Sequence, residues 1–144
     1  MSSEELHAIQ LLGRVPYGRL ATSMRALPIL TVARHIVTDG RVVLRVHGGP
    51  GYHDACDGTV VAYGADNYNA ATSEGSSDLW SVQFTGPAQI IEPTRAQREL
   101  LGPVPAEVNG EPFAPAYLRV DPHFVTVHTL DFDATPQIRQ RSVI

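Results

Sequence analysis

The chain of 144 residues has a formal net charge of −4, is 43% hydrophobic and 18% charged, and contains no lysine. Its length fits one domain, the lack of a basic run argues against nucleic-acid binding, and no apolar stretch approaches the roughly 20 residues that span a membrane. Because Cys56 is the only cysteine and residues 1–5 are polar and acidic, unlike a secretion signal, we expect a reducing, cytoplasmic location.

The first predicted elements are a short helix and a strand. Ser2 and Glu5 have the spacing of a helix capping box, apolar residues follow at helical intervals, and Gly13 ends the segment. We therefore predict a helix over residues 3–12 and a first strand over residues 19–23.

A hairpin gives the clearest local signal. Residues 29–37 are rich in β-branched side chains, residues 42–46 form a return strand, and Asp39-Gly40 is the kind of pair that a tight two-residue turn prefers. A loop rich in Gly and Pro follows at 47–51, and we expect one or two helical turns at 52–57.

Strands alternate with polar connections in the second half of the chain. We predict strands at 59–63 and 79–91, the second of them bent at Gly86-Pro87 because proline cannot donate to a sheet ladder. Between them, the polar residues 67–78 are expected to form a mobile loop that could act as a lid.

A second capped helix is predicted at 94–101. Thr94 and Gln97 repeat the capping-box spacing, and Gly102-Pro103 supplies the stop. The following stretch, 103–115, contains four prolines and is expected to be a loop.

Two more strands, at 117–120 and 124–130, are predicted around an Asp121-Pro122 turn. The total is about six strands with two or three short helices, and a small antiparallel barrel removes the exposed sheet edges of such a set. We therefore predict a mainly β fold with one domain over residues 1–132. The polar tail, 133–144, is expected to be disordered or to reach a partner subunit.

Glycine and histidine mark one candidate site. The loop at 48–51 can present backbone N–H groups to a phosphate, although a plain turn is the simpler interpretation and Pro50 removes one donor. His47 and His53 flank this loop and could face one cavity. Because no histidine pair has a metal-binding spacing, we expect no metal site; the histidines considered are His35, His47, His53, His123 and His128.

Arginine and tryptophan supply further candidates. Arg34 and Arg45 lie on opposite arms of the predicted hairpin, where they could bind a carboxylate or phosphate, or else be solvated or form dimer salt bridges. Trp80 could stack on a planar ligand, or anchor a core or an interface. Cys56 has no dedicated base beyond His53, and we interpret it as inert packing.

Several short motifs follow one another in a distinctive order: Gly18–Thr22, Pro28 at the start of a strand, Asp39–Arg45, Gly58–Ala62, Trp80–Gly86 and a closing segment, Leu118–Thr126. This order resembles the pyridoxamine 5′-phosphate oxidase-like family, also called FMN-binding split barrels, and the closing segment resembles the last hairpin of the family. The resemblance covers roughly residues 5–130. It implies a six-stranded antiparallel split barrel that dimerises, with two flavin sites in the dimer interface.

The resemblance also implies a cofactor and its binding residues. Members of the family use FMN, and some relatives use FAD, the deazaflavin F420 or heme. The strand after Pro28 would line the flavin ring, and the end of the next strand with its loop, commonly RTxxGTK or RTxxGSK, would hold the phosphate. The residues carried over, together with the candidates above, are Val32, Ala33, Arg34, His35, Arg45, Val46, His47, Gly49, Gly51, His53 and Trp80.

The phosphate loop departs from the family pattern at three positions. Arg45 and Gly49 match, but Val46, Pro50 and Gly51 stand where the family has two hydroxyl residues and a lysine. Each lost charge-assisted hydrogen bond is worth about 1.5–3 kcal/mol, so FMN binding would weaken by orders of magnitude unless His47 or His53 compensates.

Two functions follow as hypotheses. The first is an FMN-dependent oxidoreductase of this family, a homodimer acting on an unidentified small molecule. The alternative is a non-catalytic dimeric barrel that has lost the FMN phosphate site and binds heme, F420 or another metabolite. The acidic tail of F420 suits a lysine-free chain poorly. Pyridoxamine-phosphate oxidation itself is not expected, because the tail residues 138–141 lack the Arg/His cluster which that activity needs.

Overall fold

A computed structural model describes residues 2–69 and 78–131, so the predicted tail at 133–144 and most of the predicted loop at 67–78 lie outside the described residues. The helices are α1 (Ser3–Leu12), α2 (Tyr52–Cys56) and α4 (Arg95–Leu101). The strands are β1 (Tyr17–Met24), β2 (Leu27–Thr38), β3 (Arg41–His47), β4 (Val60–Asp66), β5 (Asp78–Ile90), β6 (Glu107–Val108), β7 (Glu111–Pro112), β8 (Pro115–Val120) and β9 (Phe124–Asp131).

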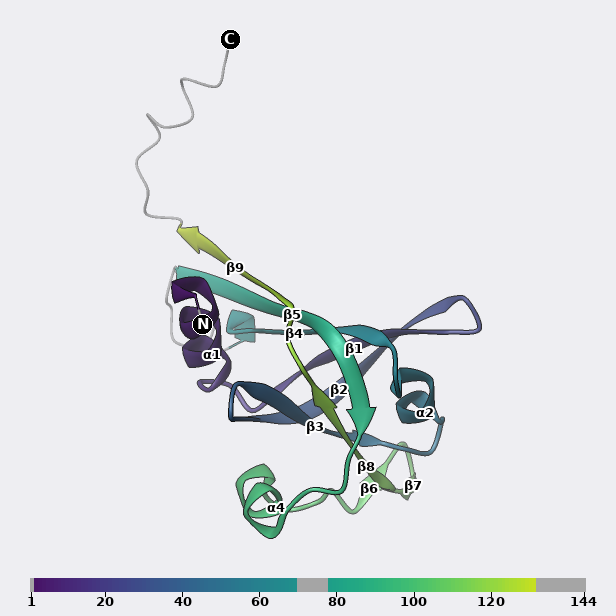
Figure 1. The fold of residues 1–144 in the computed structure, drawn as a ribbon. Helices are drawn as coiled ribbons and strands as arrows, with labels where there is room; N and C mark the ends of the chain where they lie inside the picture. Colours follow the sequence, from purple (N-terminus) through teal and green to yellow (C-terminus); the bar gives the residue numbers. More distant parts are fainter. Residues whose placement is uncertain (1, 70–77, 132–144) are drawn as a thin grey trace.

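The predicted six-stranded antiparallel barrel is confirmed. Neighbouring strands follow the order β4-β1-β2-β3-β8-β5, and β5 pairs back with β4 to close the ring. β5 is long and strongly curved, and β9 continues along it beyond the ring (Figure 1). Each ring strand has a neighbour on both sides over part of its length, and such closure limits the edge available for edge-to-edge association.

The predicted hairpin around Asp121-Pro122 is wrong. β8 does not pair with β9; both strands follow the same edge of β5, with Ile90 opposite Leu118 and Thr85 opposite Phe124. The connecting residues stay bonded to β5, since Asp121 N donates to Pro87 O at 3.0 Å. The proline therefore bends the chain without reversing it. This bend passes so close to Gly86 that a Cβ there would collide with the Asp121 carbonyl.

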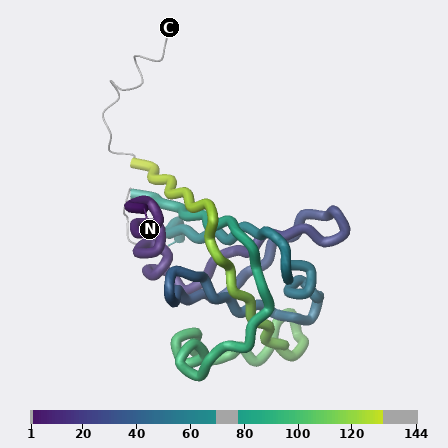
Figure 2. Tube along the Cα trace, viewed as in Figure 1, coloured from purple at the N-terminus to yellow at the C-terminus, as the bar shows by residue number. Residues whose placement is uncertain are grey.

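Two hairpins of the barrel use the same turn geometry. The β2–β3 turn was predicted from Asp39-Gly40, and both residues have positive φ, 52° and 73°, as that turn requires. The β1–β2 turn adopts the same conformation at Arg25 and Ala26, with φ of 53° and 66°. Left-handed backbone at residues other than glycine is costly. This hairpin projects from the barrel (Figures 1 and 2).

The stretch predicted as a loop at 103–115 contains a small hairpin. β6 and β7 pair through Val108 and Glu111, around a turn in which Asn109 and Gly110 have φ of 51° and 81°. Asn-Gly is a strong turn signal, but each flanking strand is only two residues long, so periodicity could not reveal them.

Both predicted capping boxes are confirmed. Ser2 Oγ accepts a hydrogen bond from Glu5 N at 3.1 Å, and Glu5 Oε1 accepts one from Ser2 N at 3.0 Å. Thr94 and Gln97 make the equivalent pair at 3.1 and 2.9 Å. The backbone hydrogen bond from Ser2 lowers the pKa of Glu5. Helix α1 then packs against β9 and β5.

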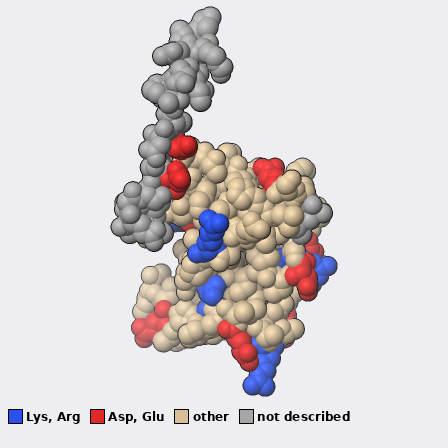
Figure 3. Space-filling view, turned by 90° about the vertical axis from the view of Figure 1, so that its left-hand side faces the viewer, with Lys and Arg blue, Asp and Glu red and all other residues tan. Residues whose placement is uncertain are grey.

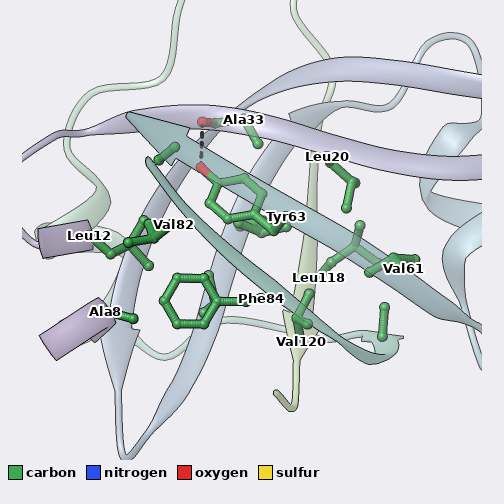
Figure 4. Packing of buried hydrophobic residues seen from close by; sticks show 14 of the residues in the cluster. Ala8, Leu12, Leu20, Ala33, Val61, Tyr63, Val82, Phe84, Leu118 and Val120 are labelled. Atoms are coloured by element: carbon green, nitrogen blue, oxygen red, sulfur yellow. Dashed lines mark hydrogen bonds between the residues drawn. The ribbon is translucent and has the colours of Figure 1, made fainter. Parts of the chain in front are cut away.

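The barrel interior holds one hydrophobic core that α1 helps to close. Ten of its members are labelled in Figure 4, among them Tyr63, Phe84, Leu118 and Val120, which are fully buried. The Tyr63 hydroxyl points towards β2, where it reaches the Ala33 carbonyl (Figure 4). Trp80 belongs to the same core and is only 8% exposed.

Candidate functional site

A cavity of about 370 Å³ lies on the outer face of the barrel, over β2 and β3. Its floor is formed by Leu30, Val32 and Arg34 of β2 and by Arg45 and His47 of β3. Its wall comes from the segment that carries the β6–β7 hairpin, through Pro105, Glu107, Val108 and Phe113. This volume is within the range of small-molecule sites. A second hollow of about 450 Å³ shares Tyr17 and Val32 with it.

Strand alternation decides which of the predicted β2 residues face the cavity. Side chains of a strand point alternately to its two faces. Val32 and Arg34 line the cavity, and Val32 is 61% exposed. Ala33 and His35 lie on the inner face and are buried. The structure therefore brings two of these four predicted residues to the cavity and places the other two in the core.

Arg34 and Arg45 lie opposite each other in the β2–β3 register. Arg45 is buried although it is on the outer face, because the chain after α4 covers it and its guanidinium donates to the carbonyls of Gly102 and Pro103 at 2.9 and 3.0 Å. Arg34 donates to backbone carbonyls as well, including that of Leu100 at 3.0 Å. Both cations are thus held by backbone acceptors of their own chain.

His47 ends β3 at the edge of the cavity with both ring nitrogens bonded. Its Nδ1 accepts from Ala114 N at 3.1 Å, which leaves Nε2 to donate to Glu111 Oε1 at 2.8 Å. The ring also packs against Phe113, with centroids 5.3 Å apart. A Cβ at Gly49 would collide with the His47 ring, so glycine at 49 permits this arrangement.

Glu111 is a site residue that sequence reasoning missed. It lies 64 positions from His47 in the chain, and the available signal was the Asn109-Gly110 turn beside it. That turn would have predicted a hairpin there, but not the residue that it meets.

The remaining predicted residues lie away from the cavity lining. Val46 points into the core, as Trp80 does. Gly51, with φ of 81°, caps the start of α2. His53 lies 3.7 Å from Asp54, and its Nδ1 is buried without a hydrogen-bond partner among the described residues.

A polar pair crosses the core beneath the cavity strands. His35 Nε2 lies 2.9 Å from the Leu12 carbonyl and donates to it, so its Nδ1 accepts from the Tyr63 hydroxyl at 2.5 Å. The Ala33 carbonyl, at 3.2 Å, shares that hydroxyl hydrogen. Burial lowers the pKa of His35, which favours the neutral imidazole, and raises the pKa of Tyr63.

The remaining chemical groups of the described residues give little support for catalysis or metal binding. Cys56 is buried, and burial raises the pKa of its thiol, which opposes nucleophilic use. Nowhere in residues 2–69 and 78–131 do three His, Cys, Asp or Glu side chains gather as metal ligands would. No helix in those same ranges has the length and apolar character needed to cross a membrane. On the face drawn in Figure 3, acidic and basic side chains are scattered and form no large patch of one sign.

Comparisons with known proteins agree with this architecture. The family described as "Pyridoxamine 5'-phosphate oxidase" matches residues 3–129. The uncharacterized protein Rv0080 of Mycobacterium tuberculosis is 34% identical over 97 residues, a match spanning 63% of this chain and 61% of that relative's length. An FAD-binding protein from Mycobacterium smegmatis superimposes with a TM-score of 0.65 at 20% identity, covering 92% of this chain and 98% of its own. An FAD-binding protein from Mesorhizobium loti gives 0.61 at 14% identity, covering 90% and 93%.

Proposed function

Because the chain belongs to the pyridoxamine 5′-phosphate oxidase family, we propose that it binds a flavin in the β2–β3 cavity and acts as a flavin-dependent oxidoreductase on a small molecule. The observation that carries this proposal is the make-up of the cavity. An apolar floor of Leu30 and Val32 lies beside the guanidinium groups of Arg34 and Arg45. A flat apolar surface suits a tricyclic aromatic ring, and adjacent cations favour a ring that gains negative charge on reduction.

The residues of this chain would have distinct tasks in that site. Val32 and Leu30 would contact the face of the ring, and Arg34 would supply positive charge at its polar edge. A bound flavin would accept and donate the hydride; the protein supplies position and electrostatics. FMN, the cofactor that the resemblance implies, would direct its phosphate towards His47 and the 48–51 loop.

We also propose that the protein is a homodimer whose second copy covers the cavity. Three apolar side chains at or beside the cavity are unusually exposed for a folded domain: Leu30 by 65%, Val32 by 61% and Tyr17 by 52%. A second copy packed on this face would bury them and enclose a ligand. Sedimentation equilibrium of wild type and Leu30→Glu tests this: we expect a dimer that the substitution weakens, and a wild-type monomer at all concentrations would contradict the proposal.

Flavin binding is tested first by the absorbance spectrum of the purified protein, before and after addition of flavin. We expect a bound-flavin spectrum with quenched fluorescence. Bleaching of that spectrum by a nicotinamide hydride donor, followed by recovery in the presence of an artificial acceptor, would support the oxidoreductase activity. A protein that ignores added flavin would contradict the proposal.

The alternative of a non-catalytic binding module is favoured by two observations. Both cavity arginines already donate to backbone carbonyls, and Val46 points away from the site. A module of this kind would hold a flavin, heme or F420 without turnover. Retention of a bound flavin that no hydride donor bleaches would support this alternative over the enzyme.

A further inference from the structure

A carboxylate of the protein lies beside the His47 end of the cavity: it belongs to Glu111, which is not a lining residue and whose side chain is 62% exposed. His47 Nε2 donates to the Glu111 carboxylate at 2.8 Å, and these two side chains form an ion pair when the imidazole is protonated. The position of Glu111 Oε1 is also 3.3 Å from where a Cβ of residue 49 would lie. The carboxylate therefore lies next to the space that the missing side chain of Gly49 leaves open beside the imidazole.

Backbone bonds fix the position of the segment that carries this carboxylate. Glu111 begins β7, directly after the tight turn of the β6–β7 hairpin. The chain just after β7 is tied to the end of β3 in both directions, because Ala114 N donates to His47 Nδ1 at 3.1 Å and Ala114 O accepts from Gly48 N at 2.6 Å. These bonds place Glu111 beside His47, where its side chain is still 62% exposed to solvent.

The other charges near the cavity leave no net positive charge for a ligand phosphate. The guanidinium groups of Arg34 and Arg45 are bonded to backbone carbonyls, and Glu107 contributes a carboxylate to the lining. The two arginines and the two glutamates balance in formal charge. A cavity with this arrangement suits an uncharged group at its His47 end better than a dianion.

We propose that Glu111 is a specificity residue whose carboxylate takes the place of a ligand phosphate, so that the site prefers a flavin without a terminal phosphomonoester, such as riboflavin, over FMN. This rests on the flavin site proposed above. A phosphate dianion could reach His47 only by displacing Glu111 or by lying next to it. Two charges repelling one at about 5 Å in a water-like dielectric weaken binding roughly tenfold.

The test compares riboflavin and FMN by fluorescence titration of three proteins: wild type, Glu111→Gln and Glu99→Gln. The glutamine at 111 keeps the size of the side chain and can still accept from His47, but it removes the charge. Glu99 is an exposed residue of α4 outside the cavity, so its variant controls for the change in net charge. We expect wild type to bind riboflavin at least as tightly as FMN. Glu111→Gln should tighten FMN roughly tenfold and leave riboflavin unchanged, and Glu99→Gln should alter neither.

Two results would overturn the specificity claim while leaving the flavin site intact. One is a wild-type preference for FMN, and the other is the same FMN-to-riboflavin ratio in wild type and Glu111→Gln. If no variant binds either flavin, the proposed function fails, and inorganic phosphate then tests Glu111 separately. Phosphate should shift the imidazole NMR signals of His47 in Glu111→Gln but not in wild type; no shift in either protein would overturn the role of Glu111.

Discussion

Replacing Tyr63 with phenylalanine should destabilise the barrel through one missing hydroxyl. In the wild-type protein this group lies 2.5 Å from His35 Nδ1 and 3.2 Å from the Ala33 carbonyl, and all three residues are buried. Phenylalanine fills nearly the same volume, so no cavity term arises. The imidazole nitrogen loses its partner without access to water, and a buried polar group left unpaired costs about 1–3 kcal/mol.

The assay is urea unfolding at a fixed protein concentration, followed by the fluorescence of the single tryptophan, Trp80, which is buried in the native core. We expect Tyr63→Phe to lower the free energy of unfolding by about 2 kcal/mol. Tyr17→Phe is the control, because Tyr17 is 52% exposed and its change should stay within about 0.5 kcal/mol. Equal, small effects of both substitutions would refute the reasoning that the His35–Tyr63 pair stabilises the core.

Three further predictions concern stability. Because burial lowers the pKa of His35 below its ordinary value of 6.5, the native state binds fewer protons than the unfolded state. The stability advantage of wild type over His35→Gln should therefore be full above pH 6.5 and shrink on acidification. A constant difference in unfolding free energy across that pH range would contradict this. Changing Arg25-Ala26 to Asn-Gly places residues that tolerate positive φ in the β1–β2 turn, so it should raise the unfolding free energy by about 1 kcal/mol in the same assay. An unchanged unfolding free energy would show that the turn is not strained. Gly86→Ala should cost about 1–3 kcal/mol or more, because its Cβ meets the rigid backbone of Asp121; a near-neutral result in thermal unfolding would mean that the β8–β9 bend yields easily.

Local signals predicted the elements well because their causes are local. The capping boxes at Ser2 and Thr94 and the turn at Asp39-Gly40 each depend on residues within a few positions, and all are present. The course of the chain after Asp121 could not be predicted from local residues. Whether a proline reverses a chain or bends it depends on what lies beside it, and here the neighbour is Gly86, far away in sequence.

The residues of the candidate site could likewise be predicted only in part from the sequence. Residues 42–46 are buried throughout, because both faces of β3 are covered, so no alternation in the sequence separates the inward Val46 from the outward Arg45. Resemblance selected a continuous run of four β2 residues, whereas strand geometry brings only Val32 and Arg34 to the cavity. Glu111 reaches His47 through a hairpin that periodicity could not detect.

The most direct test of the central claim is a flavin titration with the cavity filled. Val32→Trp places a large side chain on the cavity floor, and Val60→Trp places the same side chain at an exposed position of β4 outside the cavity lining. The proposed site predicts saturable quenching of riboflavin fluorescence by wild type and by Val60→Trp, and its loss in Val32→Trp. Quenching that is equal in all three proteins would show that the flavin binds elsewhere, and no quenching by wild type would contradict flavin binding itself.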